Sequence, residues 1–218
     1  MVKTYPRRKF IKKGSMAAVA GSLMYSCSAK SYSRIVGSNE RIQVSVMGVN
    51  SRGNALAQNF ASQETCDVIH ICDVDSRAIS KCITALKDRQ DIEARAYTDV
   101  RKSLESKDVD ALVIAAPDHW HAPAALLAMQ AGKHVYVEKP CSHNPKEGEI
   151  LVEAAIKYNK IVQMGNQRRS WPNVIAGINA IKNGEIGNVY FGKGWYTNNR
   201  ASIGIGKETA VPEWLNWE

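Results

Sequence analysis

From residue 41 onward, short apolar runs alternate with longer amphipathic stretches, and this alternation constrains the fold more than any other feature of the chain. The runs have the length and composition of strands that are buried on both faces, and the stretches have the length and period of helices. Such a succession of strand, helix and strand builds a parallel sheet with helices packed on it. We therefore predict an α/β fold, a Rossmann-type doubly wound parallel sheet, with strands at 42–46, 68–72, 111–115, 134–137 and 161–164 and helices near 53–61, 76–87, 121–131 and 146–158.

Several helix boundaries carry local signals. Thr98 or Asp99 can cap a short helix, and Pro123 suits a first helical turn. Gly132 can adopt the left-handed conformation that ends a helix.

The pattern changes after residue 165. It predicts a helix over 172–182 that Gly184 closes, a strand over 187–196, and loop-like sequence to residue 218. About 50 residues are too few to bury a sizeable core of their own. We therefore expect residues 35–165 to form the sheet domain and 166–218 to be the truncated start of a second domain.

The first 34 residues differ from the rest. Arg7 and Arg8 form a twin-arginine pattern, and an uncharged stretch follows over 14–29. This is typical of an export signal for proteins that fold before transport, so we expect 1–34 to be a signal and linker and the protein to be periplasmic or otherwise exported. A basic disordered arm is the alternative. A lipid anchor at Cys27 also stays open, because the residues before it faintly resemble a lipoprotein cleavage site.

The positive net charge belongs to this leader. Eight of the 29 Lys and Arg residues lie in it and no Asp or Glu does, which leaves 21 basic and 21 acidic residues in the rest. With no basic stripe among aromatic residues there, we expect no nucleic-acid partner. The remaining cysteines have neither zinc-ligand nor redox-pair spacing, so we expect free, mostly buried thiols at Cys66, Cys72, Cys82 and Cys141.

A glycine-rich turn follows the first predicted strand and opens the first predicted helix. The pyrophosphate of a dinucleotide meets a helix N-terminus at this position, so we predict cofactor binding. Asn replaces the middle glycine of the GxGxxG pattern, and Asn is the non-glycine residue that best tolerates positive φ. The predicted cofactor-binding residues of the turn are Gly48, Asn50, Ser51, Arg52 and Gly53.

Asp73 ends the second predicted strand, 20 residues after Gly53. A carboxylate at this position accepts hydrogen bonds from the adenosine ribose hydroxyls and repels a 2′-phosphate. We therefore predict NAD as the cofactor in preference to NADP. The alternative is that Asp73 only caps the next helix.

Two further strand ends carry polar residues. Pro117, Asp118 and His121 follow the third clear strand and are predicted to approach the cofactor or the substrate, and Trp120 is either a sugar-stacking platform or a domain-interface residue. Because His119 and His121 have no clustered third ligand, we expect no metal site.

Lys139 stands between Glu138 and Pro140 where the next strand ends. Ligands of parallel sheets bind at such carboxyl ends, so this lysine is placed to meet a substrate. The Lys-Pro bond can be cis, which would direct the lysine into a cleft. The alternative is a solvated lysine before a strand-ending proline.

These segments resemble the Gfo/Idh/MocA oxidoreductases, which include glucose-fructose oxidoreductase and inositol dehydrogenase. The resemblance covers roughly residues 41–200 and rests on the turn at 48–53, CDVD at 72–75, APDHWHA at 116–122 and AGKHVYVEKP at 131–140. It implies that Lys139 is a catalytic-site residue and that Glu138 lies on the cofactor side. His121 matches the histidine of the family's PxxxH pattern.

The resemblance also implies a second α/β domain with an open sheet, which covers the nicotinamide and binds a sugar, a polyol or a related ring. The family's further catalytic Asp and His are not found before residue 218. Arg168 and Arg169 lie where that domain begins and are predicted to reach the substrate, or else to solvate a loop. Family members often pair through the second sheet, so we expect a homo-oligomer at full length.

The function that follows is reversible hydride transfer between NAD and a secondary alcohol of a carbohydrate-like ring. Lys139 would act as the base, with its pKa lowered by burial beside the nicotinamide, or would bind the alkoxide while a histidine moves the proton. One alternative is a glycosidase that retains NAD and oxidises the sugar transiently. The second is a non-catalytic nucleotide-binding remnant.

Overall fold

The computed structural model describes residues 41–197, 199, 201–202 and 204–217. The predicted signal at 1–34 and Cys27 lie outside these residues. Among the residues described, no helix has both the length and the apolar character needed to span a bilayer. The fold below is that of the unit Ile42–Glu218.

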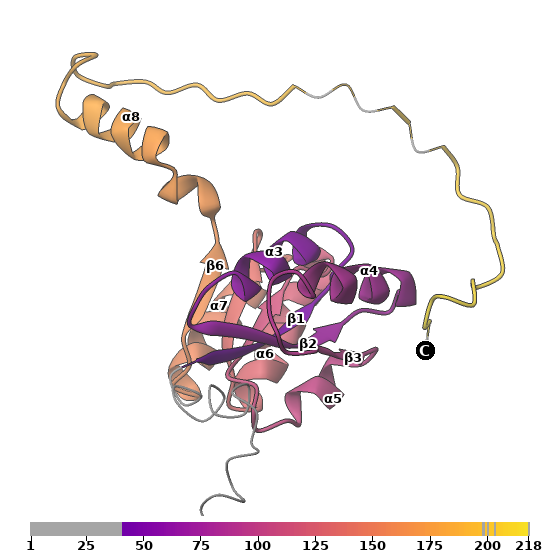
Figure 1. Ribbon diagram of the computed structural model, residues 1–218. Coiled ribbons are helices and arrows are strands. Elements are labelled where there is room, and N and C mark those ends of the chain that lie inside the picture. The colour runs from indigo at the N-terminus through magenta and orange to yellow at the C-terminus, as the bar shows by residue number, and fades with distance from the viewer. Residues whose placement is uncertain (1–40, 198, 200, 203, 218) are drawn as a thin grey trace, which may run out of the picture. The chain divides into compact units, whose positions relative to one another are not determined.

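Six parallel strands form one sheet in the order β3-β2-β1-β4-β5-β6, which places β1 beside β4 near the centre (Figure 1). The central strands bury mostly apolar residues, such as Val44 and Val46 of β1 and Leu112 and Val113 of β4, as expected where helices cover both faces. This confirms the predicted Rossmann-type doubly wound sheet. The strands are β1 (Ile42–Met47), β2 (Cys66–Cys72), β3 (Arg95–Tyr97), β4 (Ala111–Ile114), β5 (His134–Glu138) and β6 (Val162–Gly165).

Helices pack on both faces of the sheet, and each face has its own core. One core joins α3 and α4 to the sheet through residues such as Leu56 and Ile79, and the other joins α5, α6 and α7 through residues such as Met129 and Leu151. The helices are α3 (Arg52–Ala61), α4 (Ser76–Leu86), α5 (Val100–Leu104), α6 (His121–Gln130), α7 (Pro145–Lys157) and α8 (Pro172–Lys182), with 3-10 turns η1 (Asp118–Trp120) and η2 (Gln167–Ser170).

The helix boundaries follow the local chemistry. Asp75, Asp99 and Asn144 each cap a helix by accepting a hydrogen bond from a backbone N–H of its first turn. Asp99, and not Thr98, is therefore the cap of the short helix α5. Gly132 has φ 78° and lets the chain leave α6 for β5, as expected.

One predicted element is wrong. Residues 187–196 form no strand, although their aromatic and polar residues alternate. A strand needs a paired neighbour to satisfy its backbone groups, and no described segment pairs with this one. The predicted helix over 172–182 and the left-handed Gly184 that follows it are both present.

Candidate cofactor site

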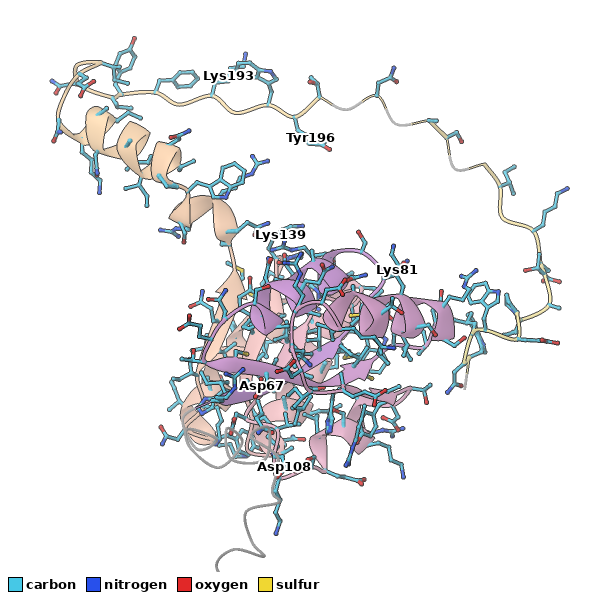
Figure 2. All side chains as sticks on the ribbon, viewed as in Figure 1. Asp67, Lys81, Asp108, Lys139, Lys193 and Tyr196 are labelled. Carbon is cyan, nitrogen blue, oxygen red and sulfur yellow. The ribbon has the colours of Figure 1, made fainter. Side chains whose placement is uncertain are left out.

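The predicted site residues follow the carboxyl ends of parallel strands, so they collect along one edge of the sheet. Gly48 follows β1, Asp73 follows β2 and Lys139 follows β5. Figure 2 shows Lys139 at this edge, while Asp67 and Asp108 lie at the opposite edge, where β2 and β4 begin. Ligands bind at the carboxyl edge in sheets of this kind.

Two glycines let the turn after β1 pack against the end of β4. Gly48 has φ 81°, and a Cβ added to it would lie 2.5 Å from the backbone nitrogen of Ala116. A Cβ added to Gly53 would lie 1.8 Å from the carbonyl oxygen of Gly48. Since real Cβ contacts are essentially never this short, both positions require glycine.

The helix that follows this turn begins without a side-chain cap. Ser51 precedes α3 and makes no capping hydrogen bond, and the first turn of α3 contains no acidic residue. The first backbone N–H groups of a helix have no partner inside the helix and attract an anion. Asn50 is exposed, and its φ is not positive, because among the described residues Asn159 is the non-glycine residue with positive φ. The left-handed conformation expected at Asn50 is therefore not found.

Asp73 is held against the glycine-rich turn. Its Oδ2 accepts a hydrogen bond of 2.7 Å from the backbone N–H of Val49, and its Oδ1 accepts one of 3.0 Å from the N–H of Asp75. The carboxylate therefore has a fixed orientation beside the start of α3. Asp75, and not Asp73, caps α4, so the alternative role for Asp73 is not the one found.

Arg52 and Glu138, both predicted to contact the cofactor, contact each other. The Nε of Arg52 donates a hydrogen bond of 2.7 Å to Oε1 of Glu138, and the Glu138 side chain is 6% exposed against 40% for Arg52. This ion pair joins the start of α3 to the end of β5. Burial raises the pKa of the neighbouring Tyr136 phenol, and the negative charge of Glu138 raises it further.

His121 is buried at the start of α6, and both of its ring nitrogens lie within hydrogen-bond distance of backbone carbonyl oxygens. Nε2 lies 2.8 Å from the oxygen of Ala116, and Nδ1 contacts the oxygen of Pro140. The ring thus joins the loop after β4 to the loop after β5. Neither nitrogen is left for a ligand, so His121 positions the two loops and does not itself extend into the site.

Lys139 is exposed, and the Lys139–Pro140 bond is cis, as the sequence allowed. No hydrogen bond or ion pair engages its amine within the described residues, so the group is free to meet a ligand. Pro117, Asp118 and Trp120 are also exposed in the loop after β4.

The two predicted arginines follow the carboxyl end of β6. Arg168 lies on η2 with its guanidinium 5.5 Å from the ring centre of Trp171, and Arg169 is exposed on the same turn. Their predicted contact with a substrate stays a prediction.

Two features of the site were not expected from the sequence. One is the Arg52–Glu138 pair, and the other is a C-terminal segment that contacts the turn after β2. The sequence shows the charged residues of the ion pair and the tryptophans of the C-terminal segment, Trp214 and Trp217. It does not show which residues they contact. In the part of the chain that the structure describes, no three His, Cys, Asp or Glu residues are grouped so that they could hold a metal ion.

The residues present fit a dinucleotide. Both glycines lack the Cβ that would fill the turn, α3 begins uncapped, and a fixed carboxylate stands at the end of β2. The pyrophosphate would lie on the turn and the start of α3, and the ribose would lie at Asp73.

Comparisons with known proteins agree with this geometry. The chain is 30% identical over 177 residues to an inositol 2-dehydrogenase of Rubrobacter xylanophilus, a match that covers 80% of this chain and 49% of that protein. It is 29% identical over 181 residues to a glycosyl hydrolase family 109 protein of Saccharopolyspora erythraea, covering 81% of this chain and 39% of that protein. The chain thus spans about half or less of the length of these relatives.

Among solved structures, GenD2 from gentamicin A biosynthesis in complex with NAD superposes with a TM-score of 0.62 at 25% identity, covering 67% of this chain and 40% of that one. The family model described as an oxidoreductase family with an NAD-binding Rossmann fold matches residues 42–166, which contain the whole sheet and the carboxyl edge described above. The chain belongs to this Gfo/Idh/MocA family of NAD-binding oxidoreductases.

Proposed function

We propose that this protein transfers a hydride between NAD and a secondary alcohol of a sugar, a polyol or a related ring. The observation that carries the proposal is the free amine of Lys139 on the same sheet edge as the glycine-rich turn and Asp73. The name of the inositol dehydrogenase relative supports a cyclic polyol as the substrate class.

Each residue has a distinct role in this proposal. The backbone of 48–53 and the start of α3 bind the pyrophosphate, and Asp73 accepts hydrogen bonds from the ribose hydroxyls. The nicotinamide, when bound, accepts or supplies the hydride. Lys139 donates a hydrogen bond to the substrate oxygen or takes its proton.

His121 and the Arg52–Glu138 pair act through position. His121 holds the loop that bears Pro140 against the loop after β4, and Glu138 holds the start of α3. Both contacts set the distance between the cofactor turn and Lys139. We therefore expect them to affect catalysis without touching the substrate.

The test begins with calorimetric titration of NAD into the folded chain. We expect saturable binding that Asp73→Ala weakens, because the ribose hydroxyls lose their acceptor. Lys139→Met should leave NAD affinity within about twofold and lower turnover of a polyol or sugar substrate by about 10²-fold or more. The control is Lys81→Met, because Lys81 is an exposed lysine on α4. An unchanged rate for Lys139→Met would remove Lys139 from the mechanism, and no NAD binding would overturn the proposal.

A second function is favoured by the relatives named as glycosyl hydrolase family 109 proteins. In this reading the protein retains NAD, oxidises a sugar carbon transiently and cleaves the glycosidic bond with no net redox change. The same residues serve both reactions, so product analysis separates them. Released sugar without accumulating NADH indicates the glycosidase, and NADH formed in proportion to oxidised substrate indicates the dehydrogenase.

We also propose export by the twin-arginine route. The twin-arginine pattern at Arg7 and Arg8 supports it. The described cysteines form no disulfide, which suits a domain that folds in a reducing compartment before transport. Replacing both arginines by lysine should keep the protein in the cytoplasmic fraction. An unaltered distribution between fractions would argue against this route.

A further inference from the structure

The C-terminal residues 212–217, here called the strap, contact the turn that joins β2 to α4. The backbone carbonyl of Trp214 accepts hydrogen bonds from the backbone N–H of Ser76 at 3.0 Å and from its hydroxyl at 3.2 Å. The N–H of Asn216 donates to the carbonyl of Val74 at 2.9 Å, and Leu215 forms an antiparallel bridge with Asp75. The strap is therefore paired to the turn through one isolated antiparallel bridge and its flanking hydrogen bonds.

This turn begins at Asp73, the proposed ribose ligand, and it also contains a cation. Arg77 lies four residues after Asp73, where a guanidinium could pair with the 2′-phosphate of NADP. Its Nε and Nη2 instead donate to the two carboxylate oxygens of Asp75, at 3.1 and 2.8 Å. The hydrogen bonds that Arg77 donates lower the pKa of Asp75 to about 2, below its usual range.

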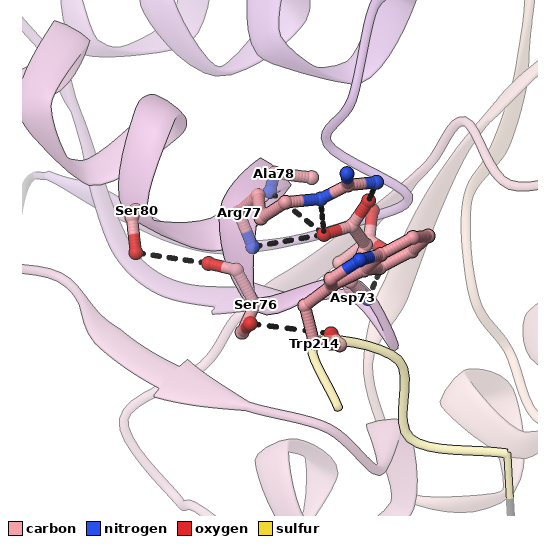
Figure 3. Close-up of polar contacts among 7 residues, drawn as sticks. Asp73, Ser76, Arg77, Ala78, Ser80 and Trp214 are labelled. Atoms are coloured by element: carbon pink, nitrogen blue, oxygen red, sulfur yellow. Dashed lines mark hydrogen bonds and ion pairs between the residues drawn. The ribbon is translucent and has the colours of Figure 1, made fainter. Parts of the chain in front are cut away.

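Trp214 fixes this arrangement. The Cζ of Arg77 lies 3.2 Å from the centre of the Trp214 ring, and Figure 3 shows the guanidinium and the ring lying against each other in the group that includes Asp73. The Arg77 side chain is 60% exposed, and an exposed ion pair by itself opens readily in water. The indole ring adds a cation–π attraction and covers one face of the guanidinium.

We propose that the strap withholds Arg77 from the ribose end of the cofactor site, and that Trp214 is thereby a specificity-determining residue for NAD over NADP. The proposal rests on the proposed function, because it assumes that NAD binds at Asp73. Asp75 neutralises the charge of Arg77, so the carboxylate of Asp73 gives the turn a net negative charge. That charge disfavours a 2′-phosphate. Releasing Arg77 would offset that charge.

The experiment compares the ratio of the Kd for NADP to the Kd for NAD by calorimetry in the full chain. Trp214→Ala should lower this ratio by about fivefold, the scale of one cation–π contact. In an Arg77→Met background, Trp214→Ala should leave the ratio unchanged, because no guanidinium remains to be released. Trp217→Ala is the matched control, since Trp217 belongs to the strap, is 77% exposed and should not alter the ratio.

A second measurement follows the strap without cofactor. Hydrogen exchange should show slow exchange at the amides of Ser76 and Asn216, which Trp214→Ala accelerates and Trp217→Ala does not. Unprotected amides in the wild type would overturn the inference, and so would an equal change of the ratio with and without Arg77. A folded wild type that binds neither nucleotide would overturn the proposed function itself. A wild type that binds NAD, with a ratio indifferent to Trp214, would overturn only the role of the strap.

Discussion

Replacing Gly53 by alanine tests the packing of the cofactor turn directly. The added Cβ would lie 1.8 Å from the carbonyl oxygen of Gly48, whereas ordinary contact begins near 3.4 Å. The two groups must therefore separate by the difference, about 1.6 Å. The oxygen belongs to the backbone and has no rotamer to escape into, so α3 must move away from the end of β1.

The expected cost is set by two opposing terms. Backbone shifts forced by overpacking cost about 1–3 kcal/mol, and a contact this short with a backbone atom belongs at the upper end. Alanine gains about 1 kcal/mol over glycine inside a helix. We therefore expect Gly53→Ala to lower the free energy of unfolding by about 2 kcal/mol, which corresponds to about 1 M in the urea midpoint.

Two other glycines provide matched controls in urea denaturation followed by circular dichroism. Gly177 lies in α8 with nothing within 4 Å of an added Cβ, so Gly177→Ala should be neutral or slightly stabilising. Gly132 also has open space but φ 78°, so Gly132→Ala should cost about 1 kcal/mol through backbone conformation alone. A Gly53→Ala protein as stable as Gly177→Ala would refute the contact and the turn geometry that depends on it.

Three further predictions concern charge and burial. Arg52→Met should destabilise the fold by about 1–3 kcal/mol, because it leaves the buried carboxylate of Glu138 unpaired. A double-mutant cycle with Glu138→Gln should show coupling in urea denaturation, and additive effects would contradict the ion pair. Burial lowers the pKa of His70, and the positive charge of a nearby arginine lowers it further. The unfolded chain therefore binds more protons, so the stability present above about pH 6.5 should fall as the pH drops below that value. A His70→Gln protein with the same pH profile of stability would refute this origin. In a Cys27→Ser background, Cys141 should react first with a thiol reagent under native conditions. The other described cysteines are buried, and burial raises the pKa of the Cys72 thiol to about 12. Equal reactivity of all four would show that the fold is open.

The location of the glycine-rich turn after β1 and the position of Lys139 were predictable because both depend on local pattern. A buried strand followed by a glycine pair and a helix leaves few arrangements for the chain, and parallel strands bring their carboxyl ends to one edge. The cap at Asp99 and the left-handed Gly132 likewise depend on neighbouring residues alone.

The roles of Glu138 and His121 could not be predicted in the same way. Their charge and position suggested contact with a ligand, yet Glu138 pairs with Arg52, 86 residues away, and the ring of His121 lies between the carbonyl oxygens of Ala116 and Pro140. A polar residue near a cofactor edge can serve the ligand or the loops that surround it, and only the three-dimensional partner distinguishes these roles.

The predicted strand over 187–196 is wrong, also because its partner could not be read from the sequence. Its alternation is a sound local signal, but a strand forms only where another backbone offers hydrogen bonds, and the sequence does not report that partner.

The sequence by itself determined the parallel α/β sheet, the cofactor turn, Asp73 at the end of β2 and Lys139 at the end of β5. These follow from periodicity and from residues that lie near one another in the chain. Only the tertiary structure decided that Glu138 holds the start of α3 and that Trp214 covers Arg77, because these pairs join segments 86 and 137 positions apart. Local propensity carries no information across such separations, so the partner of a buried charge or an exposed ring is a property of packing.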